Sequence, residues 1–152
     1  MLRKSFSRVC VVVLAGAVCC SIAPAQIAAS ARETNDTTKW TIEKCVNVFS
    51  KDKIEKTDAG YQYWFVDKTL AGGKTLKLSV VKPGSATHAP HAHPEEEFFF
   101  VLEGTVEFSL NGGRKVVGPL SSLYCPPNVE HGIRNVGDTE ARYLVVKKYE
   151  QK

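Results

Sequence analysis

The stretch HAPHAHPEEE, residues 88 to 97, concentrates side chains that suit metal binding. It holds three of the four histidines of this 152-residue chain within six positions and ends in three glutamates. Neutral imidazole nitrogens and carboxylate oxygens together are the donors that divalent transition metals prefer. The question is which of these side chains converge on one point.

The alternation of side chains along an extended backbone selects among them. Residues i and i+2 of a strand point the same way, so His91 and His93 project onto one face, which Glu97 shares. His131, the remaining histidine, follows PPNVE on a segment that a compact β-protein can bring alongside. The sequence thus predicts a metal site made of His91, His93, Glu97 and His131.

Such a donor set suits one divalent cation, and Fe, Mn, Zn, Ni, Co and Cu are all compatible, with ligand distances of about 2.0 to 2.2 Å. Three nitrogens and one oxygen leave positions free on an octahedral ion, where a substrate can bind. Phe99 and Val101 continue the ligand face, so we expect an apolar and dry pocket around the metal.

The neighbouring residues have simpler interpretations. A lone surface histidine is usually only solvated, and Glu95 and Glu96 fit an exposed charged face. Glu95 shares the parity of Glu97, which keeps it as a substitute ligand. His88 lies off the ligand face and is expected beside the ligands, near the mouth of the pocket, or exposed to solvent.

From residue 41 onward, short β-branched and aromatic runs alternate with turn residues. Expected strands are 61–66, 74–81, 98–102, 105–110, 115–117, 122–125 and 141–149. Asn111-Gly112 supplies the positive φ angles of a tight hairpin. The run TIEKCVNVF, residues 41–49, fits a strand or a short helix. Many short strands with little helical periodicity predict an all-β sandwich or barrel.

Within 74–81, Leu76, Leu78 and Val80 share one face while Lys77 and Ser79 share the other, which is typical of a half-buried strand.

Three tyrosines, Tyr61, Tyr63 and Tyr124, would line the pocket if their strands turn inward, although packing is the commoner role. Arg134 lies three positions after His131 and is expected on the opposite, exposed face.

The first 25 residues resemble a secretory signal peptide, with a basic start, an apolar run from residue 9 to about 20 and a small-residue signal at 23–25. The run is too short for a stable membrane span, and a second cleavage choice lies at 29–31. A retained anchor, or a lipoprotein at Cys19 or Cys20, is the alternative. The polar composition of residues 26–40 predicts a disordered tether. Residues 41–152 are expected to form the folded domain, and the leader indicates a secreted or periplasmic protein.

Charge and cysteine content narrow the possibilities further. The net charge of +4 falls to about +1 once the three basic residues of the leader are removed. Lys and Arg are scattered among acids, which argues against nucleic-acid binding. Cys45 and Cys125 remain after cleavage, and they would either pair in an oxidising compartment or stay as two half-buried thiols.

The histidines, the glutamate and the turn residues around them occur in an order and spacing that resemble the two motifs of a small single-domain cupin. The first motif is matched by Gly84, His91, His93, Glu97 and Gly104, with one extra residue after Gly84. The second is matched by Pro126, His131 and Asn135, with Leu120 and Asn128 at its glycine positions. Asn tolerates the left-handed region, whereas Leu120 puts the turn before that strand in question.

The resemblance implies a jelly-roll barrel, or double-stranded β-helix, with a metal in its mouth and frequent homodimers through terminal strands. It does not fix a reaction, because cupins include oxalate oxidases and decarboxylases, dioxygenases, isomerases, lyases and binding proteins. We therefore consider a metal-dependent enzyme of oxygenase or lyase type acting on a small oxygen-bearing substrate. The alternatives are a non-catalytic module that binds a small molecule or a metal, and a purely structural metal.

Overall fold

The structure of the protein, a computed structural model, describes residues 37–150. The predicted signal peptide and most of the predicted tether lie outside the described residues. The last part of that tether includes a 3-10 turn, η1 (Thr37–Lys39), which is followed by the short helix α1 (Ile42–Cys45) and a second turn, η2 (Lys51–Lys53). Of the two alternatives for residues 41–49, the short helix is the correct one, and its side chains are exposed.

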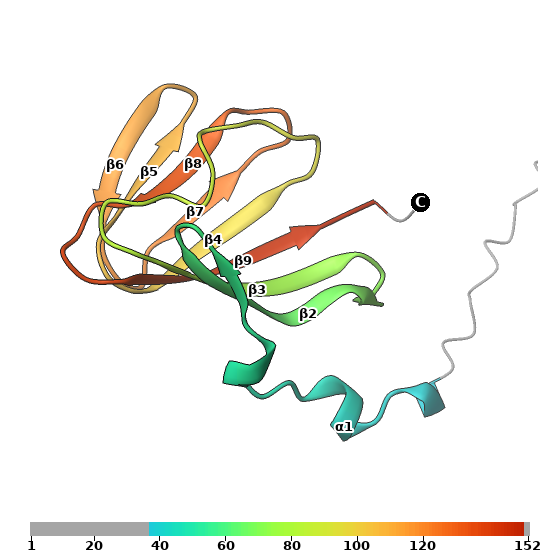
Figure 1. Ribbon diagram of the computed structural model, residues 1–152. Helices are drawn as coiled ribbons and strands as arrows, with labels where there is room; N and C mark the ends of the chain where they lie inside the picture. The colour runs from blue at the N-terminus through green and yellow to red at the C-terminus, as the bar shows by residue number, and fades with distance from the viewer. Residues whose placement is uncertain (1–36, 151–152) are drawn as a thin grey trace, which may run out of the picture. The chain divides into compact units, whose positions relative to one another are not determined.

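Two antiparallel β-sheets make up the rest of the described chain (Figure 1). The larger sheet has the strand order β1 (Glu55–Thr57), β2 (Gly60–Ala71), β3 (Lys74–Val81), β9 (Ala141–Lys148), β4 (Glu97–Glu103) and β7 (Ser122–Cys125). The smaller sheet has the order β6 (Gly113–Val117), β5 (Val106–Leu110) and β8 (His131–Asn135). The sheets do not close into one hydrogen-bonded barrel, but their arrangement is the jelly roll that the sequence predicts.

The hydrophobic core lies between the two sheets. Val81, Phe99, Val101, Tyr143 and Val145 come from the larger sheet, and Val106, Phe108 and Ile133 from the smaller one. In β4 the buried residues alternate strictly with exposed ones, because successive side chains of a strand point to opposite faces. Glu97 shares the inward face of β4 with the core aromatics, which places one carboxylate at the end of the core.

All seven expected strands are present, and for two of them, β3 and β7, both ends agree with the expectation. Two short strands were not expected. β1 has the polar, mostly exposed sequence EKT and pairs with β2 alone, so it carries no hydrophobic pattern. β8 contains Gly132 and Arg134, and its strand structure follows from pairing with β5 rather than from its own composition.

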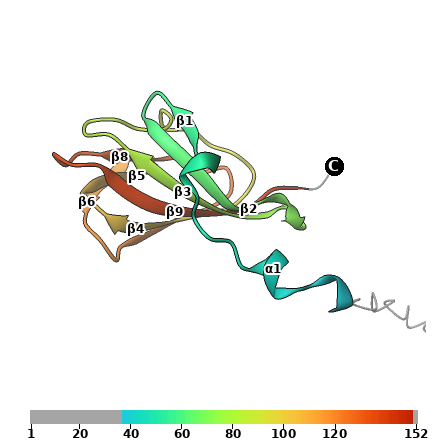
Figure 2. The same cartoon turned by 60° about the horizontal axis from the view of Figure 1, so that its bottom comes forward.

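The polar face of β3 points into the protein. Thr75 and Ser79 are 4% and 1% exposed, whereas the apolar Leu76 and Leu78 lie on the outer face of the sheet and are half-buried. The chain before β1 covers part of that outer face (Figure 2), where the hydroxyl of Tyr63 donates a hydrogen bond of 2.9 Å to the carbonyl of Val48. Tyr63 therefore packs outside the barrel.

Tight turns explain several positions of the two motifs. Asn111 and Gly112, with φ of 48° and 78°, form the hairpin between β5 and β6 that the sequence predicts. Gly104 has a φ of 84°, and a Cβ there would lie 2.7 Å from the Cα of Ala141, so this position requires glycine. Leu120 and Asn128 keep the left-handed conformation of the glycines that they replace, with φ of 62° and 60°.

The two cysteines in the described chain are both free, so the alternative of a disulfide is wrong. The alternative of two half-buried thiols is also inaccurate, because Cys45 is exposed and Cys125 is fully buried. Burial raises the pKa of Cys125 to about 12, with a smaller effect from the charge of Glu97. Its thiol stays protonated at neutral pH and is chemically inert. No helix of the described residues is long and apolar enough to cross a membrane.

Leu120 is a strained position that a single substitution should relieve. Its side chain is 82% exposed and contributes little packing, while its left-handed backbone is unfavourable for a residue with a Cβ. Leu120→Gly should raise the free energy of unfolding by about 1 kcal/mol, measured by urea denaturation. The matched control, Leu120→Ala, keeps the Cβ and should stay within about 0.5 kcal/mol of the parent. Equal stability of the two variants would contradict this interpretation.

Candidate metal centre

Backbone pairing places two distant histidines side by side. The N–H of His91 donates to the carbonyl of His131 and the N–H of His131 donates to the carbonyl of His91, both at 3.0 Å. His131 begins β8, whereas His91 lies in the irregular segment between β3 and β4. Such a reciprocal pair fixes two facing residues of neighbouring strands, so the two imidazoles leave the backbone as neighbours.

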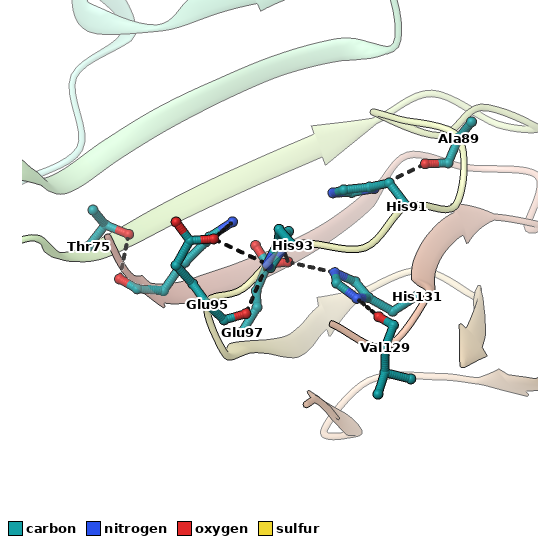
Figure 3. A network of polar contacts seen from close by, with 9 residues as sticks. Thr75, Ala89, His91, His93, Glu95, Glu97, Val129 and His131 are labelled. Carbon is teal, nitrogen blue, oxygen red and sulfur yellow. Dashed lines mark hydrogen bonds and ion pairs between the residues drawn. The ribbon is translucent and has the colours of Figure 1, made fainter. Parts of the chain in front are cut away.

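One ring nitrogen from each of His91, His93 and His131 lies within 4.8 Å of the other two. Their ring centroids are 4.7 to 5.4 Å apart. The three side chains differ in burial, since His131 is fully buried, His93 is half-buried and His91 is exposed. Figure 3 shows the three rings turned toward one common region, with the carboxylate of Glu97 beside the ring of His93. The cluster therefore reaches from the interior to the surface.

Each of the three imidazoles uses its Nδ1 in the same way. Nδ1 of His91, His93 and His131 lies 3.1, 2.8 and 2.8 Å from the backbone carbonyls of Ala89, Glu95 and Val129, respectively. A carbonyl only accepts, so each Nδ1 carries the proton that it donates. The Nε2 atom of each ring is left to face the centre of the cluster, and this second hydrogen bond is the arrangement that orients histidine ligands of metals.

Glu97, the first residue of β4, supplies an oxygen to the same centre. Its Oε2 lies 3.4 Å from Nε2 of His93 and 3.2 Å from Nε2 of His131. The residue is 8% exposed, and carboxylates are rarely buried without a charged or hydrogen-bonded partner. Electron-rich atoms gathered this closely need a proton or a cation among them. The three imidazole nitrogens could therefore hold a metal ion, and the Glu97 oxygen lies beside two of them.

A small cavity of about 90 Å³ opens beside this cluster. Its apolar wall includes Phe99, Ile133 and Val145, but Val101 does not reach it. The rest of the wall is polar and contributed by Lys77, Ser79, Thr87, His88, Tyr143, Lys147 and Tyr149. The expectation of an apolar pocket is therefore wrong, because the polar face of β3 and alternate residues of β9 point inward.

Glu95 lies on the outer side of the cluster. Its Oε2 is 3.4 Å from Nδ1 of His93, the nitrogen that faces away from the centre, and 3.5 Å from Nζ of Lys147. This position makes Glu95 a partner of His93 and Lys147 rather than a substitute ligand.

The other residues singled out by the sequence fall on both sides of the barrel wall. His88 and Phe99 line the cavity, and the rings of His88 and His91 meet edge to face at 5.5 Å. Burial, and next the positive charge of His91, lower the pKa of His88. Arg134 is exposed, and its guanidinium donates to the carbonyl of Gly84 at 2.9 Å.

Tyr124 does not line the cavity, and its assignment to the pocket is wrong. It pairs with Phe98, the outward neighbour of Glu97, so its ring lies on the outer face of the larger sheet. The residue is 45% exposed, its ring stacks on Phe98 at 4.9 Å, and its hydroxyl donates to Glu96 at 3.3 Å. Tyr61 lies in an outer groove with Phe65 and Leu78.

The cavity residues that the sequence interpretation missed come chiefly from β9. Tyr143, Val145 and Lys147 alternate along this strand and face the same cavity, which Tyr149 also reaches after the strand ends. The alternation was visible in the sequence, but it did not reveal which face of β9 is inside. Lys77 and Ser79 of β3 were recognised as sharing a face, and that face is the inner one.

A larger groove of about 760 Å³ contains none of the four donor residues. Glu107, Arg114 and Arg134 are among the residues that line it. The groove and the inner cavity share a few wall residues, such as His88. Its size exceeds that of the inner cavity, but His91, Glu97 and His131 line the inner one.

Comparisons with known proteins agree with this architecture. Residues 77–147 match the family model of the cupin domain, a stretch that includes all four donor residues. Polyketide synthase CurC of Streptomyces cyaneus is 39% identical over 70 residues, which are 45% of this chain and 45% of CurC. The chain thus spans about half the length of this curated relative.

Two solved structures share the fold. A protein described as a predicted oxalate decarboxylase from Thermotoga maritima superposes with a TM-score of 0.62 at 21% identity, covering 68% of this chain and 97% of that one. The polyketide cyclase RemF of Streptomyces resistomycificus gives a TM-score of 0.57 at 21% identity, covering 68% and 79%. With fold, motifs and family match in agreement, residues 77–147 of this chain form a cupin domain.

Proposed function

We propose that this protein is an exported metal-dependent enzyme, of oxygenase or lyase type, that acts on a small oxygen-bearing organic molecule. The observation that carries the proposal is the convergence of three imidazoles beside a small cavity, with the carboxylate of Glu97 next to two of them. His91, His93, Glu97 and His131 would hold one divalent transition metal, with Fe, Mn, Zn, Ni, Co and Cu all compatible. Such a metal would act as a Lewis acid on a substrate oxygen.

The chain itself supplies position and environment. The carbonyls of Ala89, Glu95 and Val129 hold the three imidazoles in the orientation that presents Nε2. Phe99, Ile133 and Val145 exclude water from one side of the cavity. The volume of about 90 Å³ corresponds to about three water molecules, so it favours a small acid or its reacting end over a polycyclic molecule.

Metal binding should depend on His91 and not on its neighbour His88. His91 is exposed and its backbone hydrogen bonds are unaffected by truncation, so His91→Ala should fold. We expect one divalent ion per chain in the parent, and an affinity at least about tenfold lower in His91→Ala. Titration calorimetry with Zn²⁺ on protein purified without a histidine tag measures both.

His88→Ala is the matched control, because it removes an adjacent exposed imidazole that lies outside the cluster of three. It should keep the affinity of the parent. Metal binding that is equal in all three proteins, or lost equally in both variants, would contradict the ligand assignment.

The enzymatic proposal predicts turnover that depends on the metal. Metal-free protein reconstituted separately with Fe²⁺, Mn²⁺, Zn²⁺, Ni²⁺, Co²⁺ or Cu²⁺ should convert at least one member of a panel of oxalate, diketones, catechols and flavonols. Oxygen consumption and product analysis distinguish oxygenase from lyase chemistry.

A non-catalytic binding module is the alternative, and one observation favours it. Glu97 is the only carboxylate among the cavity-lining residues that the structure describes, so no second carboxylate is available there as a general base. Tight binding of a panel member without turnover by any metal form would support the module and contradict the enzyme.

Export and self-association are further parts of the proposal. The leader-like first 25 residues support export, and the resemblance to cupins supports a homodimer. Exposed apolar residues on the outer face of the larger sheet also support association, among them Phe98, Phe100, Tyr124 and Val146. Native mass spectrometry of protein from an exporting host should give twice the mass of a chain shortened by 25 or 31 residues. A chain of full length would contradict export with cleavage, and a monomeric mass would contradict the homodimer.

A further inference from the structure

The inner face of the larger sheet carries positive charge directly beside the metal cluster. Lys147 on β9 lies between Thr75 of β3 and Glu97 of β4, and Lys77 pairs with Val145 two residues along β9. Both lysines line the cavity, where Glu97 is the only carboxylate among the described lining residues. Two ammonium groups therefore face one carboxylate, even before a divalent cation is added.

The two ammonium groups differ in their pairing with carboxylates. Lys147 has one ion pair, at 3.5 Å to Glu95, and its side chain is only 10% exposed. Nζ of Lys77 lies 5.1 Å from the centre of the Trp64 ring, and no carboxylate of the described residues forms an ion pair with it. Burial lowers the pKa of Lys77, because the charged form loses water, and the negative charge of Glu97 offsets this loss only in part. An anion in the cavity would offset that loss.

A buried hydroxyl in the same wall also lacks a partner. Tyr143 is 1% exposed, and its hydroxyl forms no hydrogen bond of ordinary length and angle with a described residue. Burial raises the pKa of Tyr143, and weak hydrogen bonding with the hydroxyls of Thr87 and Ser79, outside ordinary length and angle, lowers it by less. Buried polar groups are normally satisfied, so this hydroxyl is available to a water molecule or to a ligand in the cavity.

We propose that Lys77 and Lys147, with the hydroxyl of Tyr143, form a carboxylate-binding subsite, so that the small molecule taken into this cavity is a carboxylic acid. The acid group lies against the two lysines, and a second oxygen of the same molecule faces the histidine cluster. The cavity of about 90 Å³ limits the whole bound part to the size of a very small acid. This inference rests on the proposed function for the role of the second oxygen alone.

Oxalate and oxamide provide the direct comparison, because they are similar in size and shape and differ in charge. Calorimetry with the Zn²⁺-loaded protein at low ionic strength should show oxalate binding at least about tenfold more tightly than oxamide. Lys147→Met and Lys77→Met should each lower the affinity for oxalate by about tenfold and leave that for oxamide unchanged. Chelator competition, run on each variant, should give an unchanged affinity for Zn²⁺.

Lys148→Met is the matched control. Lys148 follows Lys147 on β9, but it is exposed on the opposite face of the strand. Its removal changes the net charge by the same amount and should not change oxalate binding. An equal effect of Lys148→Met and Lys147→Met would overturn the subsite, and so would parent protein that binds oxalate and oxamide equally. Inorganic phosphate that binds more tightly than oxalate would overturn the assignment to a carboxylate.

The same titrations on metal-free protein separate this inference from the metal proposal. Oxalate should bind more weakly there, but its preference over oxamide and its dependence on Lys147 should remain. A protein that binds no metal but retains this preference would contradict the proposed function and support the subsite. A protein that binds metal but does not prefer oxalate over oxamide would contradict the subsite and leave the proposed metal site supported.

Discussion

The reciprocal hydrogen bonds between the backbones of His91 and His131 are the contact on which the site depends. They join a segment between two strands of the larger sheet to the first residue of a strand in the smaller sheet. No regular ladder continues on the His91 side, so the register rests on this isolated bridge together with the hydrogen bond of 2.8 Å that the N–H of Asn128 donates to the carbonyl of His93. A slip of one residue would turn the imidazole of His91 to the opposite face, because side chains alternate along extended chains. Backbone register, rather than side-chain attraction, therefore assembles the cluster.

The interior shows a division between a part that stabilises the fold and a part arranged for chemistry. Val101, Val106 and Ala141 are completely buried in the apolar core. Toward the other end of the larger sheet, strands β3, β4 and β9 present Lys77, Glu97 and Lys147, groups that are costly to remove from water unless they are paired. Natural sequences depart from the rule of an apolar interior at functional sites, where a ligand completes the pairing. The polar end of this barrel has the character of such a site.

The all-β class and the clustering of His91, His93 and His131 could be predicted from alternation and spacing, and the jelly roll from the resemblance of the motifs to cupins. Glu97 alternates with Phe99 in β4, and the bounds of β3 and β7 follow from composition and turn residues. What alternation cannot tell is which face of a strand is inside. It therefore misplaced Tyr124, and it missed Lys147 of β9. Strand β8 was missed because it is stabilised by a long-range pairing with β5, whereas its own residues Gly132 and Arg134 have little preference for strands.

The central claim is that four donors from two segments surround one metal ion, and X-ray absorption spectroscopy of the metal-loaded protein tests it most directly. The account predicts a first shell with three imidazole nitrogens and a carboxylate oxygen at about 2.0 to 2.2 Å, completed by oxygen from solvent or ligand. A shell of oxygen atoms alone, without the outer-shell scattering that imidazole rings produce, would contradict it.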